Sequence, residues 1–272
     1  MQVLCQLLRN RCISFAFLLA LALIPHSQAM KVVVFYALDI DGERISEGLS
    51  QATGKNRNPL PSDFYILEEK KVRLEKMTPG PVSTAWAAAS VAETFSPDLI
   101  ISIGPAGALD PEMAIGDIGL VTSIIPYQQG TWTESGFEAR QTSIQIFGID
   151  RFKDKAVEIF GIDSPASNLC AASGEAFVAS ESQTSFLRDR LGASLVEMNL
   201  FGLVGSDRTK NIPGLHVRIV SDFADSNARD DFLEFVDTYK GDLGRETVQL
   251  ILNLPADPRS PANYEGLRNL LE

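Results

Sequence analysis

The stretch 98–108, Asp-Leu-Ile-Ile-Ser-Ile-Gly-Pro-Ala-Gly-Ala, is the part of the chain that most directly indicates the fold. Its first six residues are mostly apolar and rich in isoleucine, which is typical of a strand buried on both faces. We expect the glycine-rich segment that follows, residues 104–108, to be a turn where a ligand can approach the backbone closely. Such glycines often only shape a turn, so the stretch indicates a buried strand and leaves ligand binding open.

Other strand-like and helix-like segments alternate along the chain on both sides of this stretch. We expect buried strands at 31–38, 118–125, 168–172, 193–198 and 215–221, and an antiparallel pair at 64–67 and 72–77. We expect helices at 81–95, 150–160, 182–191 and 227–252, the last broken at Gly241. This alternation predicts a three-layer α/β/α sandwich with a central mixed sheet. Ligands in such folds bind beyond the carboxyl ends of the strands.

The first 29 residues have the three parts of a secretory signal peptide. Arg9 and Arg11 are basic, residues 13–24 are apolar, and Ser27 and Ala29 are small residues where signal peptidase cleaves. We therefore expect residues 1–29 to be removed and residues 30–272 to form one domain in the periplasm or outside the cell. Translation starting at Met30 would instead give a cytoplasmic protein. No later run is apolar enough for a membrane helix, so no membrane contact is expected of the mature chain.

The composition restricts the partners and the cofactors. The chain carries a formal net charge of −11, which disfavours nucleic acid and anionic membranes as partners. Only Cys170 and His216 remain beyond the leader, so the mature chain can form neither an intrachain disulfide nor a histidine-rich metal site. His216 lies inside a strand-like run, where a packed histidine is expected.

Two acids stand at the ends of predicted buried strands. Glu197 lies in the segment Val-Glu-Met-Asn at 196–199, and Asp222 follows Ser221. Burial raises the pKa of such a carboxyl group and lets it act as a general acid. Asp222 could instead cap the helix that follows. Phe177 follows a glycine turn and could stack on a flat base or belong to the core.

Taken in order, these motifs resemble the nucleoside phosphorylase and nucleosidase superfamily, and most closely the methylthioadenosine/S-adenosylhomocysteine nucleosidases. The resemblance runs through 31–38, 78–81, 104–108, 116–117 and 221–222. It implies a hydrolase that cleaves the N-glycosidic bond of a purine nucleoside of the methylthioadenosine or adenosine type, without a metal or an organic cofactor. It also implies a homodimer, to whose active site residues 127–137 could contribute.

The resemblance also implies roles for individual residues. Asp222 protonates the purine at N7, and Asp41 activates the attacking water, with Glu43 nearby as an alternative. Phe177 stacks on the base and the backbone of Val178 reads its edge. The remaining residues implied in substrate binding are Ala106, Gly107, Glu197, Met198 and Asn199.

Two departures from the family pattern bear on the chemistry. Asn199 replaces a glutamate that accepts hydrogen bonds from the ribose hydroxyls, and an amide offers one acceptor oxygen, two donors and no charge. By analogy with the loss of one oxyanion-hole donor, this change costs about 2–4 kcal/mol in the transition state. Phosphorylases of the superfamily bind phosphate at positions that are Ser102 and Pro105 here, and proline has no N–H to donate. Hydrolysis is therefore favoured, with a phosphorylase or a catalytically impaired nucleoside-binding or storage protein as the alternatives.

Overall fold

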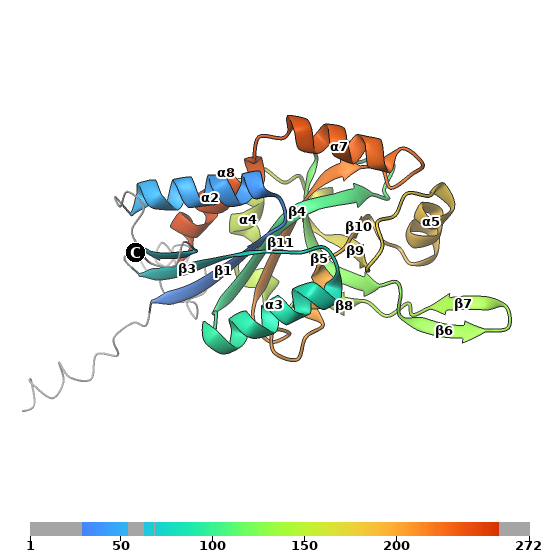
Figure 1. The fold of residues 1–272 in the computed structure, drawn as a ribbon, viewed down its shortest axis with the longest axis horizontal. Coiled ribbons are helices and arrows are strands. Elements are labelled where there is room, and N and C mark those ends of the chain that lie inside the picture. The colour runs from blue at the N-terminus through green and yellow to red at the C-terminus, as the bar shows by residue number, and fades with distance from the viewer. Residues whose placement is uncertain (1–28, 54–62, 68, 256–272) are drawn as a thin grey trace, which may run out of the picture.

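A computed structural model describes residues 29–53, 63–67 and 69–255, and the expected leader lies outside these ranges except for Ala29. A nine-stranded sheet forms the centre of the molecule (Figure 1). Its strands run in the order β10-β9-β5-β11-β4-β1-β3-β2, and β8 pairs with β5. The strands are β1 (Met30–Tyr36), β2 (Phe64–Leu67), β3 (Lys70–Lys76), β4 (Leu99–Ala108), β5 (Ile118–Pro126), β8 (Ile144–Gln145), β9 (Leu169–Ser173), β10 (Leu195–Glu197) and β11 (Gly214–Asp222).

The sheet is mixed and partly closed on itself. β4 runs parallel to β1 and β11, whereas β11 and β5 are antiparallel. β10 pairs with β9 and also, antiparallel, with the end of β4. This extra pairing joins β4, β11, β5, β9 and β10 into a ring of five strands, because each of them pairs with the next.

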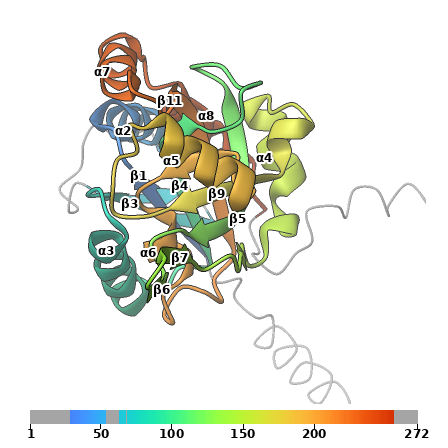
Figure 2. The same ribbon diagram turned by 90° about the vertical axis from the view of Figure 1, so that its right-hand side faces the viewer.

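Helices cover both faces of the sheet, as Figures 1 and 2 show. On one face α8 (Asp242–Asn253) packs against α2 (Asp39–Ala52) and α4 (Lys153–Phe160). On the other, α3 (Pro81–Thr94) packs against α6 (Leu200–Val204). The short α5 (Glu181–Ser185) and α7 (Ala228–Thr238) lie near the loops that join the strands, and the hairpin of β6 (Gly130–Thr133) and β7 (Gly136–Ala139) projects from the body. The predicted three-layer α/β/α arrangement is confirmed.

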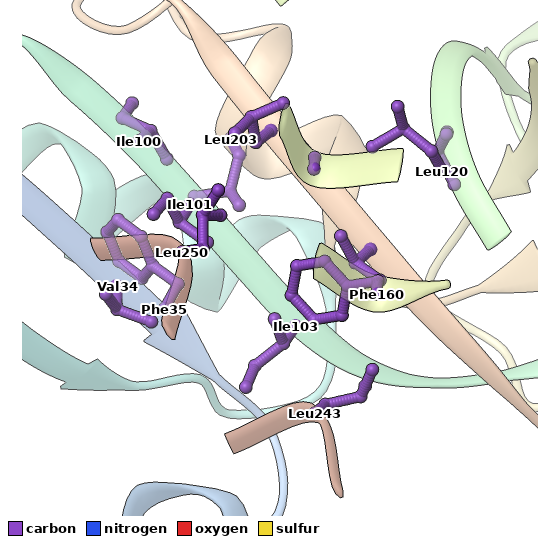
Figure 3. Close-up of a cluster of buried hydrophobic side chains, with 14 of the residues drawn as sticks. Val34, Phe35, Ile100, Ile101, Ile103, Leu120, Phe160, Leu203, Leu243 and Leu250 are labelled. Carbon is purple, nitrogen blue, oxygen red and sulfur yellow. The ribbon is translucent and has the colours of Figure 1, made fainter. Parts of the chain in front are cut away.

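The core covers both faces of the sheet, and one part of it lies between the sheet and α8. Strand residues Val34, Ile101 and Ile103 are fully buried there, and Leu243 and Leu250 of α8 pack on the same cluster (Figure 3). A fully buried aliphatic side chain contributes about 1.5–3 kcal/mol relative to an exposed one. The continuous apolar runs of β1 and β4 therefore stabilise the sheet and hold its carboxyl ends in place.

Most predicted elements are present, and the antiparallel pair β2–β3 and the break at Gly241 are confirmed. Gly241 adopts a φ of 77°, a conformation that glycine allows without steric cost. The prediction of a turn at 104–108 is wrong, because β4 continues to Ala108 and pairs with β11 along this segment. Along the described part of the chain, no helix is long and apolar enough to cross a membrane.

β4 changes neighbours along one of its edges, and this change opens space for a ligand. β1 pairs with β4 up to Ile103, and β10 begins to pair at Gly107. Between them, no strand among the described residues pairs with Gly104 to Ala106 on that edge. A proline inside a central strand is tolerated where a ladder bond is absent, which accounts for Pro105.

Candidate active site

A cavity of about 240 Å³ lies at this change of neighbours. Six segments of the chain form its walls, together with one residue of α7. Its lining residues are Ala37, Leu38, Met77, Pro79, Gly104–Gly107, Ala176–Val178, Val196–Asn199, Arg218, Ser221, Asp222 and Phe232. The walls are mostly apolar with a few polar groups, which is typical of a small-molecule site. Of the nine site residues predicted from the sequence, the cavity brings together all except Asp41.

Asp222 is the carboxylic acid best placed for proton transfer at this cavity. It ends β11, and its side chain is buried yet lines the cavity. Oδ2 accepts a hydrogen bond from the Ser221 hydroxyl at 2.8 Å, and Oδ1 accepts one from the Ala224 amide at 3.0 Å. Burial raises the pKa of Asp222 above its ordinary value, although these two hydrogen bonds oppose the rise. A carboxyl group in this state can hold a proton and donate it to a bound base.

Gly107 makes the position of Asp222 possible. It is the register partner of both Asp222 in β11 and Val196 in β10. A Cβ at this position would lie 2.8 Å from Oδ1 of Asp222 and 3.0 Å from the Cβ of Ala224. A larger residue at position 107 would therefore push against both the Asp222 carboxyl group and Ala224, so glycine allows the close packing of the strands and the placement of the acid.

The wall beside Asp222 is aromatic and is fixed to the same loop. Phe177 is 45% exposed and its ring meets that of Phe232 edge-on, with the centroids 5.9 Å apart. Val178 is buried. Ala224, whose φ is +53°, directs its carbonyl to the amide of Ser180 at 3.0 Å and to the hydroxyl of Thr184 at 2.6 Å. These bonds tie the segment after Phe177 to the loop that carries the acid.

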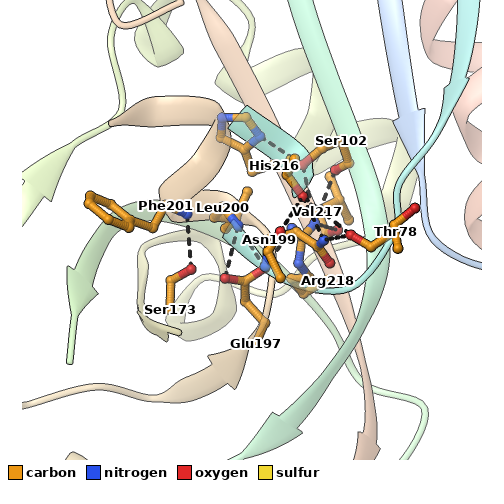
Figure 4. A network of polar contacts seen from close by, with 12 residues as sticks. Thr78, Ser102, Ser173, Glu197, Asn199, Leu200, Phe201, His216, Val217 and Arg218 are labelled. Carbon is orange, nitrogen blue, oxygen red and sulfur yellow. Dashed lines mark hydrogen bonds and ion pairs between the residues drawn. The ribbon is translucent and has the colours of Figure 1, made fainter. Parts of the chain in front are cut away.

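Glu197 and Arg218 form a buried ion pair in the cavity wall. The Nη2 of Arg218 lies 3.1 Å from Oε2 of Glu197, and both side chains are 1% exposed. The Glu197 carboxylate also accepts hydrogen bonds from the amides of Asn199 and Leu200 at the start of α6 (Figure 4). A buried carboxylate needs such partners. Glu197 thus holds Arg218 and α6 against the cavity.

Ser102 and His216 lie beneath this pair and do not line the cavity. The Ser102 Oγ lies 2.8 Å from Nδ1 of His216 and 3.2 Å from Nη1 of Arg218 (Figure 4). Because the guanidinium can only donate, the serine hydroxyl donates to Nδ1 of a neutral imidazole. Complete burial, with Arg218 adjacent, lowers the pKa of His216 to about 3. The expectation of a packed strand histidine is confirmed.

Asn199 and Met198 follow Glu197 on the same wall. Nδ2 of Asn199 donates to the Thr78 carbonyl at 2.9 Å and to the Thr84 hydroxyl at 2.8 Å. The Met198 carbonyl accepts a hydrogen bond from the Gly80 amide at 2.9 Å. The segment after β3 is therefore fastened to the segment after β10, and both contribute to the cavity.

Asp41 lies elsewhere, which corrects the expectation drawn for it. It is the third residue of α2, and its fully buried side chain packs towards α8. Its Oδ1 accepts hydrogen bonds from the Tyr239 hydroxyl at 2.8 Å and from the Gly244 amide at 3.0 Å. The neighbouring Glu43 is exposed. Neither carboxylate lines the cavity, so the water-activating role implied for Asp41 has no support from its position.

Three contributors to the site had no part in the predicted set. Arg218 sits inside a run that reads as a buried strand, and a charged residue in such a run is the signal that could have identified it. Phe232 of α7 and Thr84 of α3 reach the site only through the packing of their helices. Within residues 29–53, 63–67 and 69–255, no cluster of histidine, cysteine or acidic side chains is arranged to hold a metal ion.

Comparison with known proteins assigns the family. The family model described as the phosphorylase superfamily matches residues 41–251, which is most of the chain. The chain belongs to the phosphorylase superfamily. The resemblance inferred from the motifs is thereby confirmed.

Individual relatives within the superfamily are nucleosidases. A 5′-methylthioadenosine/S-adenosylhomocysteine nucleosidase of Staphylococcus aureus is 27% identical over 181 residues, covering 64% of this chain and 79% of the relative. A solved Helicobacter pylori enzyme of that name, in complex with a substituted pyrrolidin-3-ol, matches with a TM-score of 0.66 and 20% identity over 83% of this chain and 99% of its own. The futalosine hydrolase of the same organism matches with a TM-score of 0.69 and 18% identity, with the same two coverages. These likenesses to solved structures support the fold of this superfamily member.

Proposed function

We propose that this protein hydrolyses the N-glycosidic bond of a purine nucleoside of the adenosine or methylthioadenosine type. The observation that carries the proposal is the buried carboxyl group of Asp222, which has a raised pKa and lies at the cavity beside the aromatic wall of Phe177. An acid in this position can protonate a base that lies flat against the aromatic ring. Protonation makes the purine a better leaving group.

The reaction follows from these groups. Asp222 donates its proton to N7 of the purine, the bond between N9 and C1′ breaks with its electron pair going to the base, and C1′ gains positive charge. A water oxygen then bonds to C1′ and releases a proton to solvent. Because the carbocation-like centre is a strong electrophile, most of the catalytic demand falls on leaving-group protonation. Met198 and Asn199 form the wall on which the sugar would lie.

The relatives support the substrate class. The S. aureus relatives are named as methylthioadenosine/S-adenosylhomocysteine nucleosidases, and one H. pylori mutant structure holds 5′-methylthioadenosine in its active site. The cavity of this chain provides the features that such a ligand needs, namely apolar walls, an aromatic side chain and a small number of polar groups. We take the purine nucleoside to be its small-molecule partner.

The hydrogen bonds of Arg218, the cationic side chain of the cavity wall, support water rather than phosphate as the nucleophile. Arg218 lines the cavity, but its Nη1 and Nη2 already donate to Ser102, Val217 and Glu197. Ser102 is buried behind the wall, and Pro105 has no N–H. An incoming phosphate dianion would therefore have to compete with Glu197 for the guanidinium.

The test is release of free base by the purified protein from adenosine, inosine and methylthioadenosine, with and without phosphate. We expect release that does not depend on phosphate. Asp222→Asn should lower kcat by at least about 100-fold, in line with the loss of a general acid, while Asp230→Asn, on the exposed surface of α7, should not. Strict phosphate dependence would establish a phosphorylase. Tight nucleoside binding without any release would establish a binding or storage protein, the alternative that the neutral Asn199 favours.

A homodimer is part of the proposal. Val82 and Trp86 of α3 and Trp132 of β6 are 75%, 82% and 80% exposed, respectively. Val82 borders a hollow of about 350 Å³ between α3, α6 and the segment before β6. A second copy of the chain would cover this apolar face. Light scattering should give twice the chain mass, and Trp86→Glu should give a monomer, whereas Leu233→Glu on exposed α7 should leave the mass unchanged.

Export is the last part of the proposal. The basic start, the apolar run at 13–24 and the small residues before Met30 support a periplasmic or secreted protein. Mass spectrometry of the protein from a periplasmic extract should show a chain that begins at Met30. A cytoplasmic protein with the same N-terminus would instead favour translation from Met30.

A further inference from the structure

Asn199 has an amide whose orientation is fixed by its protein partners. Nδ2 lies 2.9 Å from the carbonyl oxygen of Thr78 (Figure 4). It also lies 2.8 Å from Oγ1 of Thr84. A backbone carbonyl can only accept a hydrogen bond, so the atom facing it must be the amide nitrogen. The opposite orientation would place two acceptor oxygens against each other.

Thr84 completes this arrangement from the first turns of α3. It is fully buried, and its Oγ1 lies 3.0 Å from the Gly80 carbonyl, to which its single proton is donated. The Oγ1 oxygen is therefore left as an acceptor for Asn199. Both hydrogens of Nδ2 are thus used by Thr78 and Thr84, and Oδ1 is the amide atom left for a ligand in the cavity.

We propose that Thr78 and Thr84 fix the orientation of the Asn199 side-chain amide, an arrangement that we call the amide lock. The fixed amide presents one neutral acceptor, Oδ1 of Asn199, to the sugar of a nucleoside. Its consequence for specificity is that the site accepts 2′-deoxyribonucleosides as well as ribonucleosides. The specificity part rests on the proposed function, whereas the lock itself does not. Asn199 is the specificity residue and Thr84 is the positioning residue.

The specificity follows from the strength of the hydrogen bonds involved. A carboxylate can bind two neighbouring hydroxyls with two charged oxygens, and charged hydrogen bonds are about twice as strong as neutral ones. The amide offers a single neutral oxygen. Losing one neutral hydrogen bond costs about two- to tenfold in affinity. We therefore expect kcat/KM for 2′-deoxyadenosine to lie within about tenfold of that for adenosine.

The lock also explains why position 199 cannot simply carry a carboxylate of the same length. In Asn199→Asp an ionised oxygen would face the Thr78 carbonyl at the place where Nδ2 now donates. Only the protonated carboxyl group could donate there, so folding should raise the pKa of the new acid. The stability of Asn199→Asp relative to the unaltered protein is then retained at pH values below the pKa that the new carboxyl group has in the unfolded chain. It is lost as the pH rises through the higher pKa of the folded state.

The first experiment needs no ligand. We would measure unfolding by urea at pH 4, 6 and 8 for the unaltered protein, Asn199→Asp and Ser83→Ala, an exposed position next to Thr84. We expect the unfolding constant of Asn199→Asp, relative to the unaltered protein, to rise at least about tenfold from pH 4 to pH 8, and that of Ser83→Ala to stay constant. A ratio for Asn199→Asp that does not change with pH would overturn the lock.

The second experiment tests the specificity. We would compare kcat/KM for adenosine and 2′-deoxyadenosine in the unaltered protein, Thr84→Val, Thr84→Ser and Ser83→Ala. Thr84→Val should bring the ratio of the two substrates towards one, because Oδ1 is no longer held, and Thr84→Ser should restore the original ratio. Discrimination above about 100-fold in the unaltered protein, beyond the loss of a neutral hydrogen bond, would overturn the specificity.

The two proposals can fail separately. If neither nucleoside is cleaved, the proposed hydrolysis is wrong, and calorimetric binding of adenosine and 2′-deoxyadenosine replaces the kinetic ratio. Affinities within about tenfold of each other would then support the neutral acceptor, and a difference above about 100-fold would overturn it.

Discussion

Replacing Asp41 with asparagine separates a structural role of this residue from a catalytic one. Asp41 is fully buried between α2, α8 and Tyr239, and its Oδ2 has no hydrogen-bond partner among the residues that the structure describes. Burial raises the pKa of Asp41 from 3.8 to about 6, although hydrogen bonds from Tyr239 and Gly244 oppose the rise. The charged form is thus the unfavourable one in the folded state.

The magnitude follows from linkage between protonation and folding. A rise of the pKa from 3.8 to about 6 corresponds to about 3 kcal/mol, because each unit is worth about 1.4 kcal/mol. Since the folded pKa is the higher one, this contribution to stability is fully present below about pH 4. It is lost as the pH rises to about 6. Asp41→Asn removes the titration, so its stability relative to the parent should improve by up to about 3 kcal/mol between pH 4 and pH 7.

Urea denaturation at pH 4, 5, 6 and 7 measures this difference. Asp39→Asn is the matched control, because Asp39 lies in the same helical turn, pairs with Lys76 and is largely exposed. Its stability relative to the parent should change by less than about 0.5 kcal/mol over the same range. If the free energy of unfolding of Asp41→Asn also differs from that of the parent by the same amount at every pH, the carboxyl group does not titrate as its burial requires and the reasoning fails.

Base release by the same variant tests catalysis. Asp41 does not line the cavity, so Asp41→Asn should keep kcat within about tenfold of the parent at pH 7. A loss of about 100- to 10,000-fold, with the stability change as predicted, would identify Asp41 as a general base and refute the argument from its position.

Three further substitutions test other parts of the structure. Gly107→Ala places a methyl group 2.8 Å from Oδ1 of Asp222. It should lower kcat by about 100-fold, because a displaced catalytic group has an effect of this size. An unchanged kcat would contradict this expectation. Arg218→Met leaves Glu197 buried and unpaired and should lower the free energy of unfolding by about 3–5 kcal/mol in urea titrations, whereas a loss below about 1 kcal/mol would show that the pair is dispensable. Thr247→Val removes a buried hydroxyl that has no partner among the described residues and should raise that free energy by about 1 kcal/mol, so a decrease of similar size would reveal an unseen hydrogen bond.

The sheet could be predicted from the sequence because its central strands are buried on both faces. β1 and β4 are mostly apolar, β11 alternates apolar residues with a few buried polar ones, and such segments have few alternatives to a buried strand. The glycine break between α7 and α8 was predictable for a similar reason, since Gly241 needs a positive φ.

Helix α2 could not be predicted, because its glycines serve tertiary contacts that a local pattern does not contain. A Cβ on Gly42 would overlap the ring of Tyr36, and one on Gly48 would lie 2.8 Å from Val248. Glycine disfavours a helix on intrinsic propensity. Here the packing of α2 against β1 and α8 overrides that propensity.

The residues of the cavity wall could be predicted from the sequence, whereas the position of Asp41 could not. Asp222 ends β11, and Asn199 and Phe177 lie in the loops that follow β10 and β9, so the sheet brings these loops to one place. Asp41 lies beyond the start of α2, and the direction of its side chain depends on the rotation of a helix whose existence the pattern did not indicate. The glycine-rich end of β4 was misjudged because its glycines permit close strand packing, a use that resembles a turn in sequence.

The charge of the cavity makes ligand binding and proton uptake interdependent. Among its described lining residues the ionisable side chains are Glu197, Arg218 and Asp222, and the first two neutralise each other. A neutral purine that excludes water from Asp222 favours the protonated acid over the ionised one. Above the pKa of Asp222, complex formation therefore draws a hydrogen ion from the medium. The measured heat of binding should then vary with the ionisation enthalpy of the buffer, and this variation counts the protons taken up.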